Sequence, residues 1–342
     1  MKKTYNWGIM GPGFIADKVL PSFAKAEGAR VLAVGSNTPG KAGAFAGKWK
    51  IPRAYENYEA LVNDPDVDII YITTPNAFHL DHARLAMEHG KNVLCEKPFA
   101  LNAKAAEEMK VCAEKQGVFL MEAMWTRFMP AVIKIKEWVD QGVIGEVHQV
   151  VSDFSYDHPY DPGYHLYDPK AGGGTLLDGG IYPLSFAGYI YGECPREYFG
   201  YANLKNGVDV RDSVVLRFSQ GQMASFICGA DTASPWCSMI YGSKGCIRVP
   251  SFFAASGFEM EHYESGKKQC VSMPFEGLGY QFELCEVMNC IDQGKKESSR
   301  MPLAESVTYM KVMDALRQSW GVVYPGYSRR AGVKNGYFKT AD

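Results

Sequence analysis

Between Tyr5 and Glu122 the sequence alternates short runs of β-branched and other apolar residues with stretches of helical periodicity. Strands that are separated by helices form parallel sheets, because each helix carries the chain back to the starting edge of the sheet. The pattern predicts an α/β Rossmann domain with a parallel sheet. The predicted strands are 5–10, 30–36, 68–73, 92–96 and 118–122, and the predicted helices are 14–27, 40–50, 77–90 and 103–116.

The pattern changes after about residue 123. A predicted helix at 127–142 is followed by long alternating runs at 146–156, 213–218, 223–228 and 245–249, and helices return at 280–293 and 303–321. Such runs are typical of antiparallel strands with one solvated face. A chain of 342 residues also exceeds the usual size of a single core. We therefore expect the Rossmann domain at 1–122 and, at 123–342, an α+β domain with an open, mainly antiparallel sheet.

A glycine motif directly follows the first predicted strand. Gly11-x-Gly13-x-x-Ala16 fits the dinucleotide fingerprint, in which glycines allow a tight turn and the close approach of a pyrophosphate to a helix N-terminus. Its place after a strand and before a helix favours this interpretation over an ordinary glycine-rich turn. Gly11, Gly13 and the first helical residues, Phe14 and Ile15, are predicted to bind the cofactor.

The end of the second strand bears on the choice between NAD and NADP. NAD-binding domains usually place an Asp or Glu about 20 residues after the fingerprint, where it holds the ribose 2′-hydroxyl. Here Ser36, Asn37 and Thr38 stand at that place, and Lys41 follows. Hydrogen-bond donors and a positive charge favour NADP. The alternative is NAD, because no arginine is present and the stretch can instead cap the next helix.

The fifth predicted strand ends in Glu96-Lys97-Pro98, at the edge of the sheet where open α/β proteins bind ligands. A lysine beside an oxidised nicotinamide can stabilise a developing alkoxide or relay its proton. The alternative is a solvated surface lysine. Because Pro98 fixes the chain directly after Lys97, the functional interpretation is preferred.

A glycine run leads into a second candidate group. In Gly172-Gly-Gly-Thr-Leu-Leu-Asp178-Gly-Gly-Ile-Tyr182, a helix would place Asp178 and Tyr182 on one face. A tyrosine hydroxyl acts as a general acid or base when a nearby ammonium stabilises its phenolate, and Lys97 would supply that ammonium. On the residues alone, an acid in the first helical turn and a core tyrosine are the simpler interpretation.

Four motifs together resemble the glucose-fructose oxidoreductase, inositol dehydrogenase and MocA (Gfo/Idh/MocA) family along nearly the whole chain. They are Gly11-x-Gly13, Thr73-Thr-Pro-Asn76-x-x-His79, Glu96-Lys97-Pro98 and Gly172-Gly-Gly-x-x-x-Asp178-x-Gly-x-Tyr182. The segment Met121-Glu-Ala-Met-Trp125-Thr-Arg127-Phe resembles the branch of dimeric dihydrodiol dehydrogenases and aldose dehydrogenases. Inositol dehydrogenases have histidine where Tyr182 stands, which also favours the dihydrodiol and aldose branch.

The resemblance implies hydride transfer between nicotinamide and a carbinol carbon of a sugar, polyol or cyclic diol. Lys97 and Tyr182 would handle the proton with help from Asp178. The Asn37 position often carries arginine in NADP-using relatives, which weakens the prediction of NADP. The residues that the resemblance adds to the cofactor site are Thr73, Thr74, Pro75, Asn76, His79, Glu96, Lys97, Trp125 and Arg127.

A loop rich in Tyr, His and Asp runs from Asp157 to Asp168. Its spacing fits no usual zinc pattern, and its prolines and glycine indicate a loop that lines a substrate pocket, so no metal is expected. The residues predicted to bind substrate are Tyr156, His158, Tyr160 and Tyr280.

Composition excludes several classes of function. With 36 basic and 38 acidic side chains, the net charge of −2 provides no field for nucleic acid. No apolar run approaches the roughly 20 residues of a membrane-spanning helix. Nine scattered cysteines suggest reduced thiols in a cytoplasmic protein.

The open sheet of the second domain needs a cover, which predicts a homodimer or a higher homo-oligomer. Two other functions remain open for the chain. One is a glycosidase that uses bound NAD for transient oxidation, and the other is a non-catalytic cofactor-binding protein.

Overall fold

The computed structural model describes residues 3–325 and 338–339 of the chain, which fold into two compact units. The first unit comprises residues 1–125 and 276–307, and the second comprises 126–275 and 308–342. The sequence-based boundary at residue 122 stays a prediction, and its domain at 123–342 includes residues 326–337 and 340–342, outside the described part. No helix within the described part is long and apolar enough to span a membrane.

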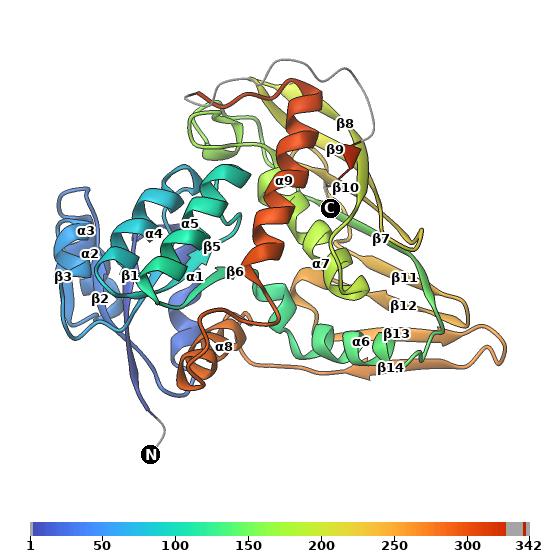
Figure 1. Cartoon of the computed structure of the whole chain (residues 1–342), viewed down its shortest axis with the longest axis horizontal. Coiled ribbons are helices and arrows are strands. Elements are labelled where there is room, and N and C mark those ends of the chain that lie inside the picture. Colours follow the sequence, from blue (N-terminus) through green and yellow to red (C-terminus); the bar gives the residue numbers. More distant parts are fainter. Residues whose placement is uncertain (1–2, 326–337, 340–342) are drawn as a thin grey trace. The chain divides into compact units, whose positions relative to one another are not determined.

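A six-stranded parallel sheet forms the centre of the first unit (Figure 1). Its strand order is β3-β2-β1-β4-β5-β6, as expected for a Rossmann domain. The central strands are buried on both faces, which explains their continuous apolar runs. The strands are β1 (Tyr5–Met10), β2 (Ala29–Gly35), β3 (Arg53–Tyr55), β4 (Ile69–Ile72), β5 (Asn92–Glu96) and β6 (Leu120–Ala123).

Helices cross between these strands, as the alternating sequence predicts. The helices α4 and α5 lie side by side (Figure 1), whereas α1 and α8 contact each other and β2. Although α8 comes from the late segment 276–307, the Tyr5 hydroxyl donates to Asp292 at its end, at 2.6 Å. The helices are α1 (Phe14–Phe23), α2 (Lys41–Trp49), α3 (Tyr58–Val62), α4 (His79–Glu88), α5 (Ala103–Gln116) and α8 (Gln281–Asp292).

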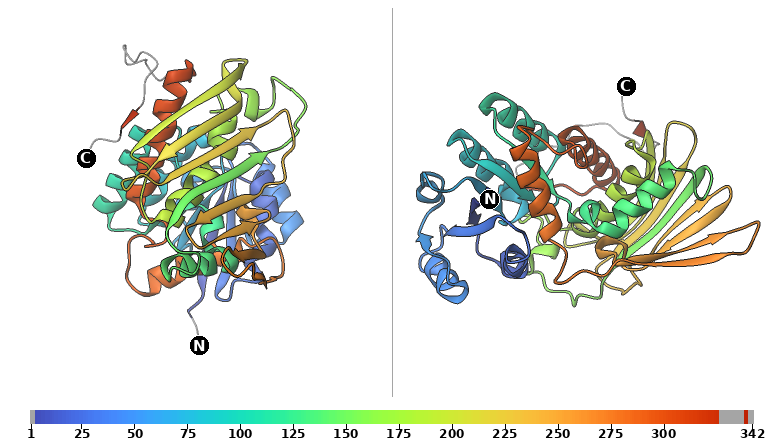
Figure 2. Two further views of the ribbon diagram at one scale, coloured as in Figure 1. Left: turned by 90° about the vertical axis from the view of Figure 1, so that its right-hand side faces the viewer. Right: turned by 90° about the horizontal axis from the view of Figure 1, so that it is seen from below.

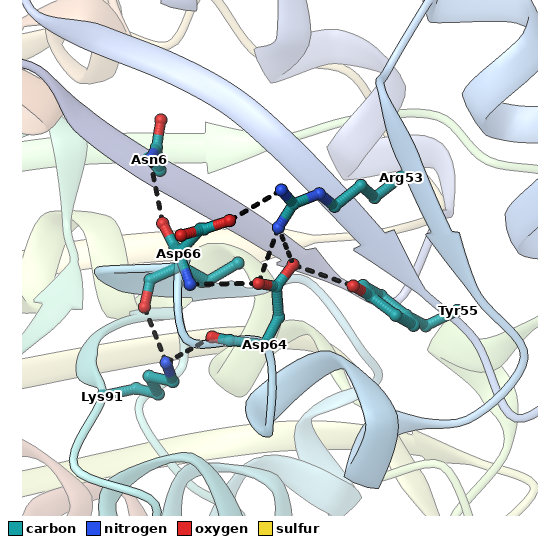
Figure 3. A network of polar contacts seen from close by, with 7 residues as sticks. Asn6, Arg53, Tyr55, Asp64, Asp66 and Lys91 are labelled. Carbon is teal, nitrogen blue, oxygen red and sulfur yellow. Dashed lines mark hydrogen bonds and ion pairs between the residues drawn. The ribbon is translucent and has the colours of Figure 1, made fainter.

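A polar network holds the amino-terminal edge of this sheet (Figure 3). The buried Asp64 carboxylate accepts hydrogen bonds from the Arg53 guanidinium at 2.7 Å and the Tyr55 hydroxyl at 2.8 Å. The Lys91 ammonium donates to the main-chain oxygen of Asp64 at 2.6 Å. Ligands of open α/β sheets bind at the opposite, carboxyl edge, so this network contributes to stability.

A nine-stranded sheet forms the second unit. Its order is β14-β13-β12-β11-β7-β10-β9-β8-β15, and its pairs are antiparallel except for the parallel pair of β7 and β10. The strands are β7 (Val147–Ser155), β8 (Glu197–Lys205), β9 (Val208–Arg217), β10 (Met223–Gly229), β11 (Ser238–Gly242), β12 (Gly245–Val249), β13 (Gly257–His262), β14 (Lys268–Ser272) and β15 (Phe338–Lys339). An α/β domain and a mainly antiparallel sheet were both expected, and both are confirmed.

Helices cover one face of this sheet, as the right-hand panel of Figure 2 shows. They are α6 (Pro130–Asp140), α7 (Ile181–Tyr191) and α9 (Leu303–Trp320), of which α9 belongs to this unit from residue 308. Side chains on β9 alternate between buried and exposed. The left-hand panel of Figure 2 looks onto the strands from the other side.

Candidate functional site

The turn after β1 is built around a glycine that no other residue can replace without strain. Gly11 has a φ of +100°, and its N–H donates to Gly35 at the end of β2, at 3.2 Å. The Thr73 hydroxyl donates to the Gly11 carbonyl at 2.7 Å. A Cβ on Gly11 would lie 2.5 Å from the Thr74 methyl group. The turn therefore depends on contacts among the carboxyl ends of three strands.

Gly13 differs from Gly11, because its conformation is open to any residue. It precedes α1 with a φ of −137°, and the nearest atom to an added Cβ is the Gly11 carbonyl oxygen at 3.9 Å. Phe14 is 71 % exposed and Ile15 is half-buried at the start of the helix. The space above Gly13, next to free N–H groups of a helix N-terminus, fits a pyrophosphate.

The residues expected around the ribose lie at the end of β2 and the start of α2. Ser36 is buried, and its hydroxyl oxygen accepts from the Thr38 N–H at 3.1 Å. The Asn37 side-chain oxygen accepts from the Tyr58 N–H at 3.0 Å, and Lys41 is exposed. A carboxylate that sequence reasoning missed also reaches this region, because Glu56 accepts from the Gly40 N–H at 2.8 Å.

His79 is fully buried between two loops at the carboxyl edge. Its Nε2 lies 2.9 Å from the Thr74 carbonyl oxygen, and its Nδ1 lies 3.0 Å from that of Pro98. Burial lowers the pKa of His79 to about 4. The neutral ring carries one N–H and donates to one of the two carbonyls at a time. His79 thus ties the Thr74 loop to the loop that carries Lys97, while Asn76 is half-buried just before α4.

Lys97 follows a buried acidic group. The Tyr71 hydroxyl donates to Glu96, whose second oxygen accepts from the Lys97 N–H at 3.2 Å. Burial raises the pKa of Glu96 to about 7, while the Tyr71 hydrogen bond and the Lys97 charge oppose the rise. Glu283 in the first turn of α8 is completely buried, and burial together with the charge of Glu96 raises its pKa well above the usual range. Burial therefore favours the neutral form of the Glu283 carboxyl group.

Two aromatic residues of the predicted site meet in the first unit. The rings of Trp125 and Tyr280 stack with their centroids 4.4 Å apart and an angle of 23° between planes. Both side chains are buried. A cofactor role for Trp125 and a substrate role for Tyr280 stay predictions.

In the second unit, Asp178 lies in a π-helical turn (Leu176–Gly180) that leads directly into α7, where Tyr182 lies in the first turn. Such turns recur at functional sites. The Tyr156 hydroxyl donates to the Asp178 carboxylate, and burial with this negative charge raises the pKa of Tyr156 well above its usual range. Tyr182 stacks on Phe154 at 4.8 Å. The structure thus brings three predicted residues onto neighbouring elements.

The other predicted substrate residues lie in the loop after β7. His158 stacks on Tyr164 at 4.1 Å, whereas Tyr160 is 43 % exposed and packs edge-on against Tyr167. The Lys205 ammonium lies 3.7 Å from the centre of the Tyr160 ring. Across the residues that the structure describes, no group of three or more His, Cys, Asp or Glu side chains could hold a metal ion.

Arg127 lies in the interior of the second unit and is 1 % exposed. Its guanidinium donates to the Ser185 hydroxyl at 2.9 Å and to the Tyr309 hydroxyl at 2.7 Å. These contacts join the segment before α6 to α7 and α9. A contact between Arg127 and the cofactor stays a prediction. In the structure, the hydrogen bonds of Arg127 to Ser185 hold α7, the helix that carries Tyr182.

Two family descriptions match the chain. One, an oxidoreductase family with an NAD-binding Rossmann fold, matches residues 5–124, and the other, the Gfo/Idh/MocA C-terminal domain, matches residues 132–248. The trans-1,2-dihydrobenzene-1,2-diol dehydrogenase of Mus musculus is 35% identical over 333 residues, which cover 94% of this chain and 98% of the relative. The enzyme of that name from Danio rerio is 36% identical, over 93% and 98% of the two chains.

Solved structures show the same architecture. The aldose-aldose oxidoreductase from Caulobacter crescentus, complexed with glycerol, is 27% identical with a TM-score of 0.84, over 92% of this chain and 96% of that one. A levoglucosan dehydrogenase, in complex with NADH and L-sorbose, has a TM-score of 0.84 at 20% identity, over 93% and 97% of the two chains. The predicted resemblance is confirmed.

Proposed function

Because the chain belongs to the Gfo/Idh/MocA family of NAD(P)-dependent oxidoreductases, we propose that it moves a hydride between nicotinamide and a carbinol carbon of a cyclic diol, polyol or sugar. The observation that carries this proposal is Lys97 at the carboxyl end of β5, held by Glu96 and by the His79-linked loop. A nicotinamide dinucleotide supplies the hydride acceptor or donor when bound. Gly11 and the open space above Gly13 fit its pyrophosphate.

We assign the transfer of the substrate's hydroxyl proton to Lys97, Asp178 and Tyr182. In the oxidative direction the Tyr182 phenolate, which the Lys97 ammonium stabilises, takes the proton of the substrate alcohol and becomes a hydroxyl. The Lys97 ammonium also stabilises the developing alkoxide. The Tyr156 hydroxyl orients Asp178 through the hydrogen bond between them. Asp178 then helps to orient the reacting groups.

The surroundings of Tyr182 support a cyclic diol as substrate. Phe154 stacks on Tyr182 at 4.8 Å, and the rings of Phe253 and Trp236 lie 5.2 Å and 6.1 Å from that of Phe154. A flat, largely apolar ring packs well on such aromatic faces. The curated relatives are named as dehydrogenases of one such diol, and an aldose is the second candidate.

The test is turnover of trans-1,2-dihydrobenzene-1,2-diol and of aldoses with NAD⁺ and NADP⁺, followed by nicotinamide absorbance. Lys97→Met should abolish turnover while the protein still binds reduced nicotinamide, measured by energy transfer from tryptophan. Lys104→Met, at an 87 % exposed lysine of the same unit, is the control. Turnover retained by Lys97→Met would contradict the proton assignment. Sugar release without net nicotinamide reduction would indicate a glycosidase instead, and binding of nicotinamide without any turnover would indicate a non-catalytic binding protein.

We also propose a homodimer that pairs the open sheet faces of two cytoplasmic copies. Large apolar side chains are exposed on neighbouring strands of that face, with Tyr201 at 73 %, Ile227 at 49 % and Val215 at 44 %. Ser213 on β9 pairs with Ile227 on β10 and with Tyr201 on β8, so the side chains of Ile227 and Tyr201 lie on the same face of the sheet. The molar mass from light scattering should be that of a dimer or of a multiple of a dimer. Ile227→Lys should lower the molar mass toward that of the monomer.

A further inference from the structure

The strands β2 and β3 end side by side at the carboxyl edge of the parallel sheet. Gly35 at the end of β2 pairs with Tyr55 at the end of β3, and the Ser36 N–H donates to the Tyr55 carbonyl at 3.0 Å. The next residue after each strand is therefore Ser36 on one and Glu56 on the other. NAD-binding domains carry their ribose carboxylate at the end of β2. In this chain a carboxylate arrives at the same edge from the neighbouring strand.

The Glu56 side chain turns toward the start of α2. Its Oε2 accepts from the Gly40 N–H at 2.8 Å, and its Oε1 lies 4.0 Å from the place of a Cβ on Gly43. Gly40 has a φ of +73° and open space around it. Two glycines thus leave the Glu56 carboxylate uncovered beside the first turn of α2.

The segment after Glu56 also contacts the stretch expected to bind the ribose. The Asn37 side-chain oxygen accepts from the Tyr58 N–H at 3.0 Å, and the Ser36 hydroxyl oxygen accepts from the Thr38 N–H at 3.1 Å. Both side-chain oxygens are used to fix the local backbone. Glu56 is exposed next to this stretch, so it can accept a hydrogen bond from a ribose hydroxyl.

We propose that Glu56 supplies the ribose carboxylate that is absent from the end of β2, and that the chain therefore favours NAD(H) over NADP(H). A carboxylate accepts a hydrogen bond from a 2′-hydroxyl but repels a 2′-phosphate. This inference rests on the proposed function, because it assumes that the edge binds a nicotinamide dinucleotide. The expectation of NADP from Ser36, Asn37, Thr38 and Lys41 is the alternative that the experiment below tests.

Helix capping is the competing explanation for Glu56, since its contact with the Gly40 N–H lies at the start of α2. Glu56→Gln separates the two explanations. Glutamine keeps a side-chain oxygen that accepts from Gly40, but it removes the charge. Capping alone predicts no change in cofactor preference, whereas a ribose carboxylate predicts a change in preference with the melting temperature retained.

The experiment titrates the full-length protein with NADH and NADPH in parallel and follows energy transfer from tryptophan to the reduced nicotinamide. We expect the wild type to bind NADH more tightly, and Glu56→Gln to shift the ratio of the two dissociation constants about tenfold toward NADPH. Glu56→Lys should shift it further. Glu59→Gln is the matched control, because this nearby exposed acid contacts His89 at 3.1 Å and Asn63 rather than α2.

The outcomes distinguish this inference from the proposed function. Tighter binding of NADPH by the wild type, or an unchanged ratio in Glu56→Gln, would overturn the role of Glu56 and leave the dehydrogenase assignment in place. An equal shift in Glu59→Gln would reduce the effect to general surface charge and would also overturn it. Failure of the wild type to bind either nucleotide would contradict the proposed function itself.

Discussion

The two glycines of the fingerprint are expected to fail in different ways when each is replaced by alanine. At Gly11 an alanine must adopt a φ of +100° and place its Cβ 2.5 Å from the Thr74 methyl group. The strained backbone costs about 1–3 kcal/mol, and the overpacking costs about 1–3 kcal/mol more. Gly11→Ala should therefore lower the free energy of unfolding by about 4 kcal/mol. This loss corresponds to about 8–16 °C in melting temperature.

At Gly13 the same methyl group meets nothing closer than 3.9 Å, and the φ of −137° suits alanine. Gly13→Ala should stabilise the fold by about 0.4–1 kcal/mol through the unfolded chain. It should nevertheless weaken binding of reduced nicotinamide by about tenfold or more, because the methyl group takes the place of the pyrophosphate.

Thermal unfolding and titration with NADH and NADPH measure both effects on the same samples. Gly47→Ala, inside α2 with no atom within 4 Å of its Cβ, is the control and should be neutral or slightly stabilising without affecting binding. A Gly13→Ala variant that binds as well as the wild type would refute the assignment of the turn to the pyrophosphate. A Gly11→Ala variant with an unchanged melting temperature would refute the strain argument.

Two further substitutions test buried polar groups by chemical denaturation. Arg127→Met should lower the free energy of unfolding by about 3–5 kcal/mol, because the hydroxyls of Ser185 and Tyr309 lose their charged donor. Arg84→Met, at a surface ion pair, is the control and should lower it by less than about 1 kcal/mol. Equal losses in the two variants would contradict the importance of the buried contacts of Arg127. Burial raises the pKa of Glu283, so the folded protein holds that proton more tightly than the unfolded chain, and stability is lost as the pH rises above the usual glutamate range. Glu283→Gln should therefore gain stability over the wild type as the pH rises above the usual glutamate pKa of about 4.3, and a gain that is independent of pH would exclude this cause.

The sequence predicted the central strands well because their patterns are local. The strands Tyr5–Met10 and Asn92–Glu96 lie where the apolar runs indicated, and so does the helix Ala103–Gln116, which begins after a capping Asn102. The strand Arg53–Tyr55 was missed, since its three residues contain no apolar run. The strands β8, β11, β13 and β14 were missed as well, although each pairs with a strand that is next to it along the chain. In β14, for example, no residue is buried, so its sequence has no apolar alternation to indicate a strand.

The candidate site was predictable as far as its motifs extend along the chain. Asp178 and Tyr182 are four residues apart, and helical geometry alone links them. Glu56 could not be predicted, because its contact with Gly40 depends on the register of two short parallel strands. Glu283 had an obvious local interpretation as an acid in the first turn of a helix. Its burial beside Glu96 follows only from the packing of a late helix on the first unit.

The late segment 276–307 also determines the order in which the protein can be completed during synthesis. The first unit has its six-stranded sheet once residue 125 has left the ribosome, but it lacks α8. In the finished protein the Tyr5 hydroxyl donates a hydrogen bond to Asp292 at the end of that helix. Residues 126–275 must be translated before that helix exists. The nascent Rossmann sheet therefore waits with one patch of its core uncovered while residues 126–275 are made. A chain that stops at residue 125 would keep this patch permanently exposed, so the smallest fragment that closes the cofactor domain extends to residue 307.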